Sequence, residues 1–311
     1  MNISVIIPVY NSEQSLPLLV SRLKPVLEKC ADEFELILVN DGSQDASWEV
    51  ITKMVEQYNW IRGISLMRNS GQHNALLCGI RMAAYDVIVT IDDDLQHPPE
   101  EIHALIAKLQ EGFDVVYGTP EKEKHGILRD IASIATKMTL KSAMGLDVAR
   151  NVSAFRAFRT PLRVAFSNYN GAFVSIDVLL TWGATRYTSI PVQHDKRRIG
   201  ASNYTFRKLI IHALNMITGF TTTPLQYASL LGFALTAFGG GVLVWVIAHY
   251  FIYGGAVPGF AFLASIVSIF SGAQLFTLGV IGEYIARMHF RLMDRPPYVK
   301  SDQVGWEPEE K

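Results

Sequence analysis

The stretch VIVTIDDDLQHPPE, residues 87–100, places three consecutive aspartates directly after a run of β-branched residues. Such a run is typical of a buried strand, here predicted over residues 86–91, and a carboxylate cluster has no packing purpose at its end. Side chains at positions i and i+2 can both turn toward one ion beside a strand end, and Mg²⁺ and Mn²⁺ prefer oxygen ligands. Asp92 and Asp94 are therefore candidate ligands of a Mg²⁺ or Mn²⁺ ion that would bridge a diphosphate.

Strand and helix patterns alternate on both sides of this stretch. Strands rich in β-branched residues are predicted over residues 3–9, 34–40, 63–67, 86–91 and 114–117. Helices are predicted between them, over residues 14–29, 45–58, 72–84 and 98–111. Later elements are predicted as a helix at 129–144, a strand at 153–158 and a helix at 174–182. This order predicts an α/β fold with a mostly parallel sheet, helices on both faces and ligands at the carboxyl ends of the strands.

Polar residues also follow the first two predicted strands, in Pro8-Val9-Tyr10-Asn11 and Asn40-Asp41-Gly42-Ser43. Because the carboxyl ends of parallel strands meet at one edge of a sheet, we expect both clusters to lie beside the aspartates. Two simpler interpretations stay open at this point. Asp41-Gly42-Ser43 could serve only as a turn and helix cap, and Tyr10 could be ordinary packing at a strand end.

Charge and cysteine content exclude several classes of protein. The formal net charge of −1 gives no support for nucleic-acid binding, which needs a basic surface. Cys30 and Cys78 fit neither a disulfide framework nor a zinc site, so both are expected to be buried thiols in a reducing compartment. The N-terminal residues run straight into a strand pattern without the features of a signal peptide, which predicts a cytoplasmic catalytic domain.

The C-terminal half contains a long apolar region. No Asp, Glu, Lys or Arg occurs from residue 209 to residue 282. Residues 225–251 and 260–281 are each long enough to cross about 30 Å of hydrocarbon, so we predict a transmembrane hairpin with an uncharged turn at 252–259. Burial in a soluble core is a weak alternative, because one small core cannot hide two helices that are apolar on every side.

Basic residues lie on both sides of the hairpin and are missing from its turn. They are Lys196, Arg197, Arg198, Arg207 and Lys208 before it and Arg287, Arg291, Arg295 and Lys300 after it. The positive-inside rule therefore predicts a multi-pass protein of the inner membrane with the catalytic domain and both termini in the cytoplasm. The expected parts are a catalytic domain at 1–203, an amphipathic juxtamembrane segment at 204–224, the hairpin at 225–286 and a cytoplasmic tail at 287–311.

Five motifs occur in order along the chain. They are Pro8-Val9-Tyr10-Asn11, Asn40-Asp41-Gly42-Ser43, Asn69-Ser70-Gly71-Gln72-His73, Asp92-Asp93-Asp94-Leu95-Gln96-His97-Pro98-Pro99-Glu100 and Arg197-Arg198-Ile199-Gly200-Ala201-Ser202. The series resembles that of the family 2 polyprenyl-phosphate glycosyltransferases, which include dolichol-phosphate mannose synthases, bactoprenol glucosyltransferases and the undecaprenyl-phosphate aminoarabinose transferase. The resemblance covers almost the whole chain and implies a GT-A, Rossmann-like fold. Residues 69–76 resemble the aminoarabinose-transferase branch more than the glucosyltransferase branch.

The resemblance implies a role for each motif residue. Nucleotide binding is implied for Pro8, Tyr10, Asn11, Asp41 and Asp93. Metal and sugar-diphosphate binding is implied for Asp92 and Asp94, which carry catalysis together with Arg197. Contact with the sugar or the acceptor phosphate is implied for Gln96, Gly200 and Ser202. The guanidinium of Arg197 and the hydroxyl of Ser202 can bind phosphate oxygens from two sides.

The chain departs from the family pattern at two places. Ser12 stands between Asn11 and Glu13, where the family has Asn-Glu, so a nucleotide contact is not carried over to Glu13. Arg150 stands where many members have an Asp that could act as a base. A phosphate monoester oxygen is already anionic near neutral pH and needs no general base, so we interpret Arg150 as a ligand of the acceptor phosphate.

These features predict an inverting, metal-dependent glycosyltransferase. It would transfer a sugar from a nucleotide sugar, with UDP as the expected nucleotide, to polyprenyl (undecaprenyl) phosphate at the cytoplasmic membrane face, supplying a lipid-linked sugar for cell-envelope glycan modification. One alternative is transfer to a saccharide or protein hydroxyl, which would need a general base. Another is a catalytically silent membrane scaffold, and the presence of both Asp92 and Asp94 counts against it.

The same features predict self-association. Glycine-bearing faces on the hairpin would let neighbouring helices pack closely, and the family resemblance implies a homo-oligomer, with a tetramer as the expected state. The tail segment Arg295-Pro296-Pro297-Tyr298-Val299 cannot be helical through its prolines. We interpret it as an edge strand added to the catalytic domain of a neighbouring copy.

Overall fold

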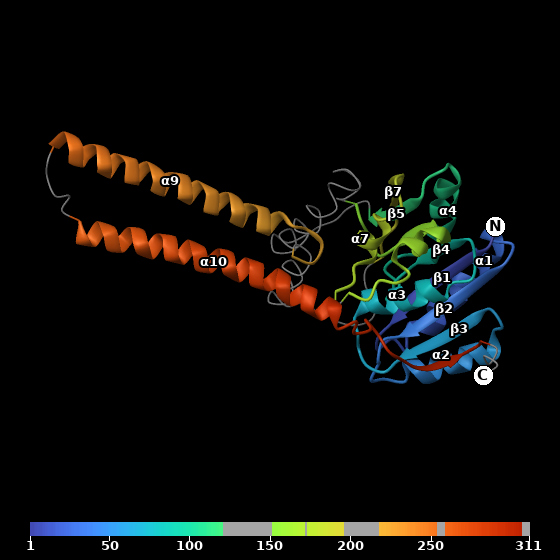
Figure 1. Cartoon of the computed structure of the whole chain (residues 1–311). Helices are drawn as coiled ribbons and strands as arrows, with labels where there is room; N and C mark the ends of the chain where they lie inside the picture. Colours follow the sequence, from blue (N-terminus) through green and yellow to red (C-terminus); the bar gives the residue numbers. More distant parts are fainter. Residues whose placement is uncertain (121–150, 172, 196–217, 254–258, 307–311) are drawn as a thin grey trace. The chain divides into compact units, whose positions relative to one another are not determined.

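The computed structural model describes residues 1–120, 151–171, 173–195, 218–253 and 259–306 (Figure 1). The chain divides into two compact units, one of Met1–Ala213 with Asp294–Lys311 and one of Leu214–Met293. The first unit, the α/β domain, confirms the predicted fold class. The predicted helix at 129–144 and most of the predicted amphipathic segment at 204–224 lie outside the described residues.

Among the described residues, the α/β domain forms an eight-stranded sheet in the order β7-β5-β6-β4-β1-β2-β3-β8. The strands are β1 (Ile3–Val9), β2 (Phe34–Asn40), β3 (Ile61–Leu66), β4 (Val87–Thr90), β5 (Val115–Pro120), β6 (Arg156–Arg159), β7 (Tyr187–Val192) and β8 (Lys300–Val304). Neighbouring strands among β1, β2, β3 and β4 run parallel, and β5 pairs in parallel with β7. Antiparallel pairing joins β6 to β4 and β5, and β8 to β3.

Helices cover both faces of this sheet (Figure 1). They are α1 (Leu16–Cys30), α2 (Ser47–Gln57), α3 (Gln72–Met82), α4 (Ile102–Gln110) and α7 (Ile176–Leu180), with 3₁₀ turns η1 (Pro99–Glu101) and η2 (Thr160–Phe166). In α1, leucines recur at helical spacing, and Leu16, Leu19, Leu23 and Leu27 are fully buried in one core with β1. Burial of each such side chain stabilises the domain by about 1.5–3 kcal/mol.

The central strands lie where the sequence predicts them, whereas one edge strand is missing from that prediction. β1 and β2 have the predicted bounds, and β4 is one residue shorter than predicted at each end. β7 is the missed strand, because its sequence mixes polar residues with Pro191. Proline is tolerated there because β7 is an edge strand that pairs only with β5 in the described sheet.

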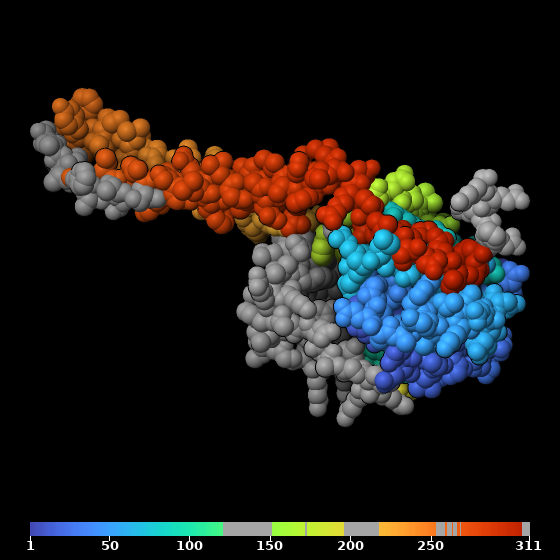
Figure 2. Space-filling view, turned by 90° about the horizontal axis from the view of Figure 1, so that it is seen from below, coloured from blue at the N-terminus to red at the C-terminus, as the bar shows by residue number. Residues whose placement is uncertain are grey.

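β8 corrects the interpretation of the tail. The strand begins only at Lys300, after the two prolines, which cannot donate to a strand ladder. It pairs with β3 of the same chain, with Gly63 opposite Val304 and Ser65 opposite Asp302. Figure 2 shows C-terminal residues, in red, on the surface of the α/β domain beside segments in light blue. The expectation that residues 295–299 form a strand on a neighbouring copy is therefore wrong.

The second unit contains two long helices, α9 (Thr223–Tyr253) and α10 (Phe260–Leu292). Thr223–Ile252 and Ile269–Leu292 are long and apolar enough to cross a membrane, with mean hydropathies of 2.1 and 1.3. Between the helices, Phe270 packs against Gly239, where an added Cβ would lie 2.9 Å from the Phe270 ring. The glycine therefore permits the close approach of α9 and α10.

Candidate active site

The loops after β1, β2 and β4 converge at one edge of the sheet. β1 lies between β2 and β4, so the carboxyl ends of these three parallel strands are neighbours. The backbone N–H of Tyr10 donates to Asp93 Oδ2 at 3.1 Å, and that of Asn11 donates to Ser43 Oγ at 3.0 Å. Asn11 Oδ1 in turn accepts a hydrogen bond from the Gln44 N–H at 2.8 Å. The loop after β1 is thus tied to both neighbouring loops, as the sequence predicts.

Tyr10 is 40% exposed, so the interpretation of this residue as core packing is wrong. Its backbone is held by Asp93, and the Ser12 hydroxyl donates to the same carboxylate oxygen. Asn11 has a φ of 55°, a left-handed conformation that Asn tolerates better than most residues. An exposed aromatic ring held at a polar edge is suited to stacking on a nucleotide base.

Asp41 is buried and holds the loop that leads into α3. Its carboxylate accepts hydrogen bonds from the N–H groups of Ser70 at 2.6 Å and Gly71 at 2.8 Å. Burial raises the pKa of Asp41, and these two donors oppose the shift. Gly42 makes the expected turn, since its φ is +66° and an added Cβ would lie 2.5 Å from a backbone nitrogen of the loop after β3. The interpretation of Asp41-Gly42-Ser43 as a helix cap is wrong, because the N-cap residue of α2 is Ala46 and no side chain caps the helix there.

Asp92 and Asp94 are partly exposed at the same edge. Gln72 Nε2, at the start of α3, donates to Asp92 Oδ1 at 2.7 Å, and the Gln96 N–H donates to Asp94 Oδ1 at 3.1 Å. Burial and the nearby carboxylates of Asp94 and Asp93 raise the pKa of Asp92 to about 7. The three carboxylates therefore form a concentration of negative charge that a bound cation would relieve.

A divalent cation fits these donors. In the described ranges, no group of three or more His, Cys, Asp and Glu side chains is placed to hold a metal ion. Two aspartates alone would leave most coordination positions to oxygens of a bound diphosphate and of water. Mg²⁺ and Mn²⁺ accept such sets of oxygen ligands. The assignment of the metal to Asp92 and Asp94 stays a prediction.

A buried ion pair close to Asp92 is missing from the sequence-based prediction. Arg156 is 1% exposed and pairs with Asp177, which is 7% exposed. Arg156 Nε also donates to Thr90 Oγ1 at 3.1 Å, on the strand that leads to the aspartates. The Arg156 charge opposes the rise in the pKa of Asp92. The available signal was a single acidic residue inside the otherwise apolar helix α7, Ile-Asp-Val-Leu-Leu.

Asp195, two residues before the basic motif at residues 197–202, lies next to the loop that carries the aspartates. The backbone N–H of Asp195 donates to the backbone oxygen of Gln96 at 2.8 Å. Gln96 is thus adjacent to both Asp94 and the segment that leads into the motif. The remaining predicted acceptor and catalytic residues lie outside the described residues: Arg150, Arg197, Gly200 and Ser202.

Two histidines outside the predicted site pack next to this junction. His97 stacks on Phe155 with ring centroids 5.3 Å apart and meets His194 edge-on at 4.9 Å. Burial, together with the charge of His194, lowers the pKa of His97 to about 4. The His97 ring is therefore neutral at physiological pH.

Residues 4–162, about half of the chain, match Glycosyl transferase family 2. The undecaprenyl-phosphate 4-deoxy-4-formamido-L-arabinose transferase of Pectobacterium atrosepticum is 35% identical over 308 residues, which cover 98% of this chain and 94% of the relative. The enzyme of the same name from Salmonella choleraesuis is 36% identical over 299 residues, covering 95% and 91%.

Glucosyl-3-phosphoglycerate synthase from Mycobacterium tuberculosis, solved with Mn²⁺, UDP and phosphoglyceric acid, has a similar structure. The TM-score is 0.51 at 18% identity, over 70% of this chain and 76% of that one. The same enzyme solved with Mg²⁺ and UDP gives a TM-score of 0.50 at 17% identity. This likeness shows a common GT-A fold, in which the neighbouring enzyme binds a divalent metal and UDP. By its fold and by its identity to relatives over nearly its whole length, the chain belongs to glycosyl transferase family 2 and is a glycosyltransferase.

Proposed function

We propose that the chain transfers a sugar from a UDP-sugar to undecaprenyl phosphate. The observation that carries the proposal is the similarity to enzymes named as undecaprenyl-phosphate sugar transferases over 98% of the chain. The acceptor would be a membrane lipid, and the chain has two helices suited to crossing a membrane. The exposed Tyr10 and the partly exposed Asp92 and Asp94 are suited to binding a base and a diphosphate.

The reaction is a displacement at the anomeric carbon of the sugar. An oxygen of the acceptor phosphate forms the new bond to that carbon, the bond from the carbon to the β-phosphate oxygen breaks, and UDP leaves with the electron pair. In-line attack inverts the anomeric configuration. Because the attacking oxygen is already ionised near neutral pH, the protein must mainly position the reactants and stabilise the leaving diphosphate.

Asp92 and Asp94 would hold Mg²⁺ or Mn²⁺, and the metal would neutralise charge on the diphosphate when bound. Tyr10 would stack on the base. Asp41 and Asp93 would also contact the nucleotide, and both carboxylates fix the surrounding loops by accepting backbone hydrogen bonds. The proposed nucleotide site is completed by Pro8 and Asn11.

The acceptor phosphate is proposed to lie beside Gln96. Arg197 follows Asp195 by two residues, and Asp195 is hydrogen-bonded to Gln96, so the chain enters the basic motif next to the aspartates. The guanidinium of Arg197 would offset charge on the two reacting phosphates. The other proposed acceptor ligands are Arg150, Gly200 and Ser202.

We further propose that α9 and α10 span the inner membrane, with the α/β domain and both termini in the cytoplasm. Arg287, Arg291 and Arg295 follow the apolar part of the hairpin, and positively charged flanks favour the cytoplasmic side. An added Cβ at Gly232, Gly240, Gly241, Gly272 or Gly279 would meet no atom of the described residues within 4 Å, so these glycines leave room for helices of neighbouring copies. We propose on this ground a homo-oligomer, with a tetramer as the expected state. The product, a lipid-linked sugar, would serve modification of cell-envelope glycans.

The test is an assay of purified full-length protein in detergent with undecaprenyl phosphate and a panel of UDP-sugars. UDP-4-deoxy-4-formamido-L-arabinose belongs in the panel because the relatives are named for that sugar. We expect mass spectrometry to show the acceptor lipid extended by one sugar residue. Products formed only on a lipid-free saccharide or protein hydroxyl would favour the alternative acceptor class.

Two variants separate the proposed site from general effects. Asp94→Asn should lower turnover by about 100-fold or more, because a predicted metal ligand loses its charge. Asp86→Asn is the matched control, since Asp86 is exposed at the opposite end of β4. Full activity in Asp94→Asn, with both proteins folded, would refute the proposed role of the aspartates.

A further inference from the structure

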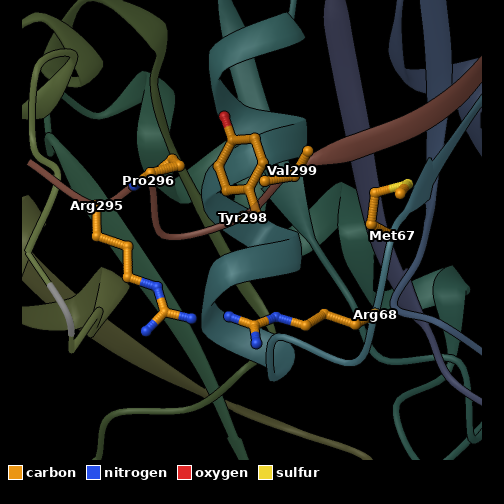
Figure 3. A pocket seen from close by; sticks show the side chains of 6 residues that line it. All are labelled: Met67, Arg68, Arg295, Pro296, Tyr298 and Val299. Atoms are coloured by element: carbon orange, nitrogen blue, oxygen red, sulfur yellow. The ribbon is translucent and has the colours of Figure 1, made fainter.

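A pocket on the α/β domain lies between the loop after β3 and the segment that follows α10 (Figure 3). Its volume is about 220 Å³, and it is lined by Met67, Arg68, Arg295, Pro296, Tyr298 and Val299. All six residues belong to the first compact unit. Figure 3 shows the guanidinium groups of Arg68 and Arg295 facing one another across the pocket.

The two arginines have no counter-charge within the described part of the chain. Both side chains are exposed, and no acidic residue lines the pocket. Asp294, next to Arg295 in sequence, instead accepts a hydrogen bond from Asn170 Nδ2 at 3.1 Å. Two facing guanidinium groups repel each other, whereas an anion between them would accept hydrogen bonds from both. A phosphate matches the planar donor arrangement of arginine.

Hydrogen bonds and a ring contact hold the walls of the pocket. The Met67 N–H donates to the Val299 backbone oxygen at 2.9 Å, just before β8 begins. The Arg81 guanidinium lies 5.7 Å from the centroid of the Tyr298 ring, and its Nη1 donates to the Tyr298 hydroxyl at 3.3 Å. Because the wall is formed before any ligand binds, little ordering entropy opposes binding.

We propose that this pocket binds the phosphate of a membrane glycerophospholipid, using residues other than those proposed for the sugar acceptor. Met67 and Val299 are 67% and 53% exposed and offer apolar surface beside the arginines, which suits an esterified phosphate. Arg295 follows Leu292, the last residue of α10, by three positions, so about 10 Å of chain at most separates the pocket from the end of α10. Basic residues at this distance from a membrane helix attract anionic headgroups.

Native mass spectrometry of the full-length protein in neutral detergent, titrated with phosphatidylglycerol, tests the proposal. Arg68→Gln and Arg295→Gln should each weaken lipid binding by about tenfold, since each removes charge-assisted hydrogen bonds to the phosphate. Arg291→Gln is the matched control, because Arg291 is an exposed arginine near the same helix end that does not line the pocket. It should bind the lipid as the parent protein does.

Competition with glycerol 3-phosphate distinguishes the sources of the phosphate. If only millimolar glycerol 3-phosphate displaces the bound phosphatidylglycerol, the result supports a lipid headgroup as the ligand. Displacement of the lipid at micromolar concentration would assign the site to a soluble phosphate ester and overturn the lipid as occupant. Equal lipid binding in the parent and both glutamine variants also overturns the proposal. Loss of UDP binding in Arg68→Gln with lipid binding intact would assign that arginine to the nucleotide site instead. Melting temperatures equal to the parent's show that the variants are folded.

Discussion

Removal of the Asp177 carboxylate tests whether a buried ion pair supports the candidate active site. Arg156 is 1% exposed and Asp177 is 7% exposed, and Arg156 Nε is also bonded to Thr90 Oγ1 at 3.1 Å. Asp177→Ala would leave the guanidinium buried without its counter-charge, at a cost of about 3–5 kcal/mol. For a domain of this size, each kcal/mol lowers the melting temperature by about 2–4 °C, so we expect a fall of roughly 6–20 °C.

Thermal unfolding of the full-length protein in detergent, followed by tryptophan fluorescence, measures this change. The control is the double variant Arg156→Met with Asp177→Leu, which replaces the ion pair with apolar side chains. It should recover most of the lost stability, because no buried charge is left unpaired. A melting temperature for Asp177→Ala within about 2 °C of the parent would refute the reasoning, since the guanidinium would then be stable without its partner.

Four further predictions concern pH, metal and the tail. The pKa of His97 is about 4 in the fold against an ordinary 6.5, so its neutral ring contributes stability that is present above pH 6.5 and lost as pH falls toward 4. The loss is at most about 3 kcal/mol, and His97→Gln should flatten the dependence of the melting temperature on pH in this range. Asp92 should change stability in the opposite direction, because its pKa is raised to about 7 in the fold: metal-free protein should lose stability as pH rises from about 4 to about 7. Melting temperatures of the parent and of Asp92→Asn over a pH series measure this change. Excess chelator should stop sugar transfer and Mg²⁺ or Mn²⁺ should restore it, whereas undiminished turnover would mean that the aspartates act without a metal. Truncation after Met293 should lower the melting temperature of the α/β domain because β3 loses its partner β8, and an unchanged temperature would contradict this role.

The central strands could be predicted because strands buried on both faces leave continuous apolar runs in the sequence. β1, Ile-Ser-Val-Ile-Ile-Pro-Val, and β4, Val-Ile-Val-Thr, are buried at every position. The edge strands lack this pattern, since Pro191 interrupts β7 and four of the five residues of β8 are exposed. Their pairing depends on partners distant in sequence, which a local pattern does not encode.

The loops of the candidate site could be predicted from the sequence, but the hydrogen bonds of their carboxylates could not. Strand ends and polar motifs identified the loops of Asp41 and Asp93, yet each carboxylate proves to be bonded to the backbone of another loop. Those contacts depend on how the loops meet in space. The Arg156–Asp177 pair likewise joins residues 21 positions apart, from a strand and a helix that only the tertiary fold brings together.

The place of β8 in the chain has a consequence for biosynthesis. β8 follows both long helices, whereas the other described strands of its sheet precede them. The edge of β3 therefore stays open during translation until α9 and α10 have been made, and an open edge invites pairing with other chains. Completion of the sheet after the apolar helices would couple maturation of the enzyme to its arrival at the membrane.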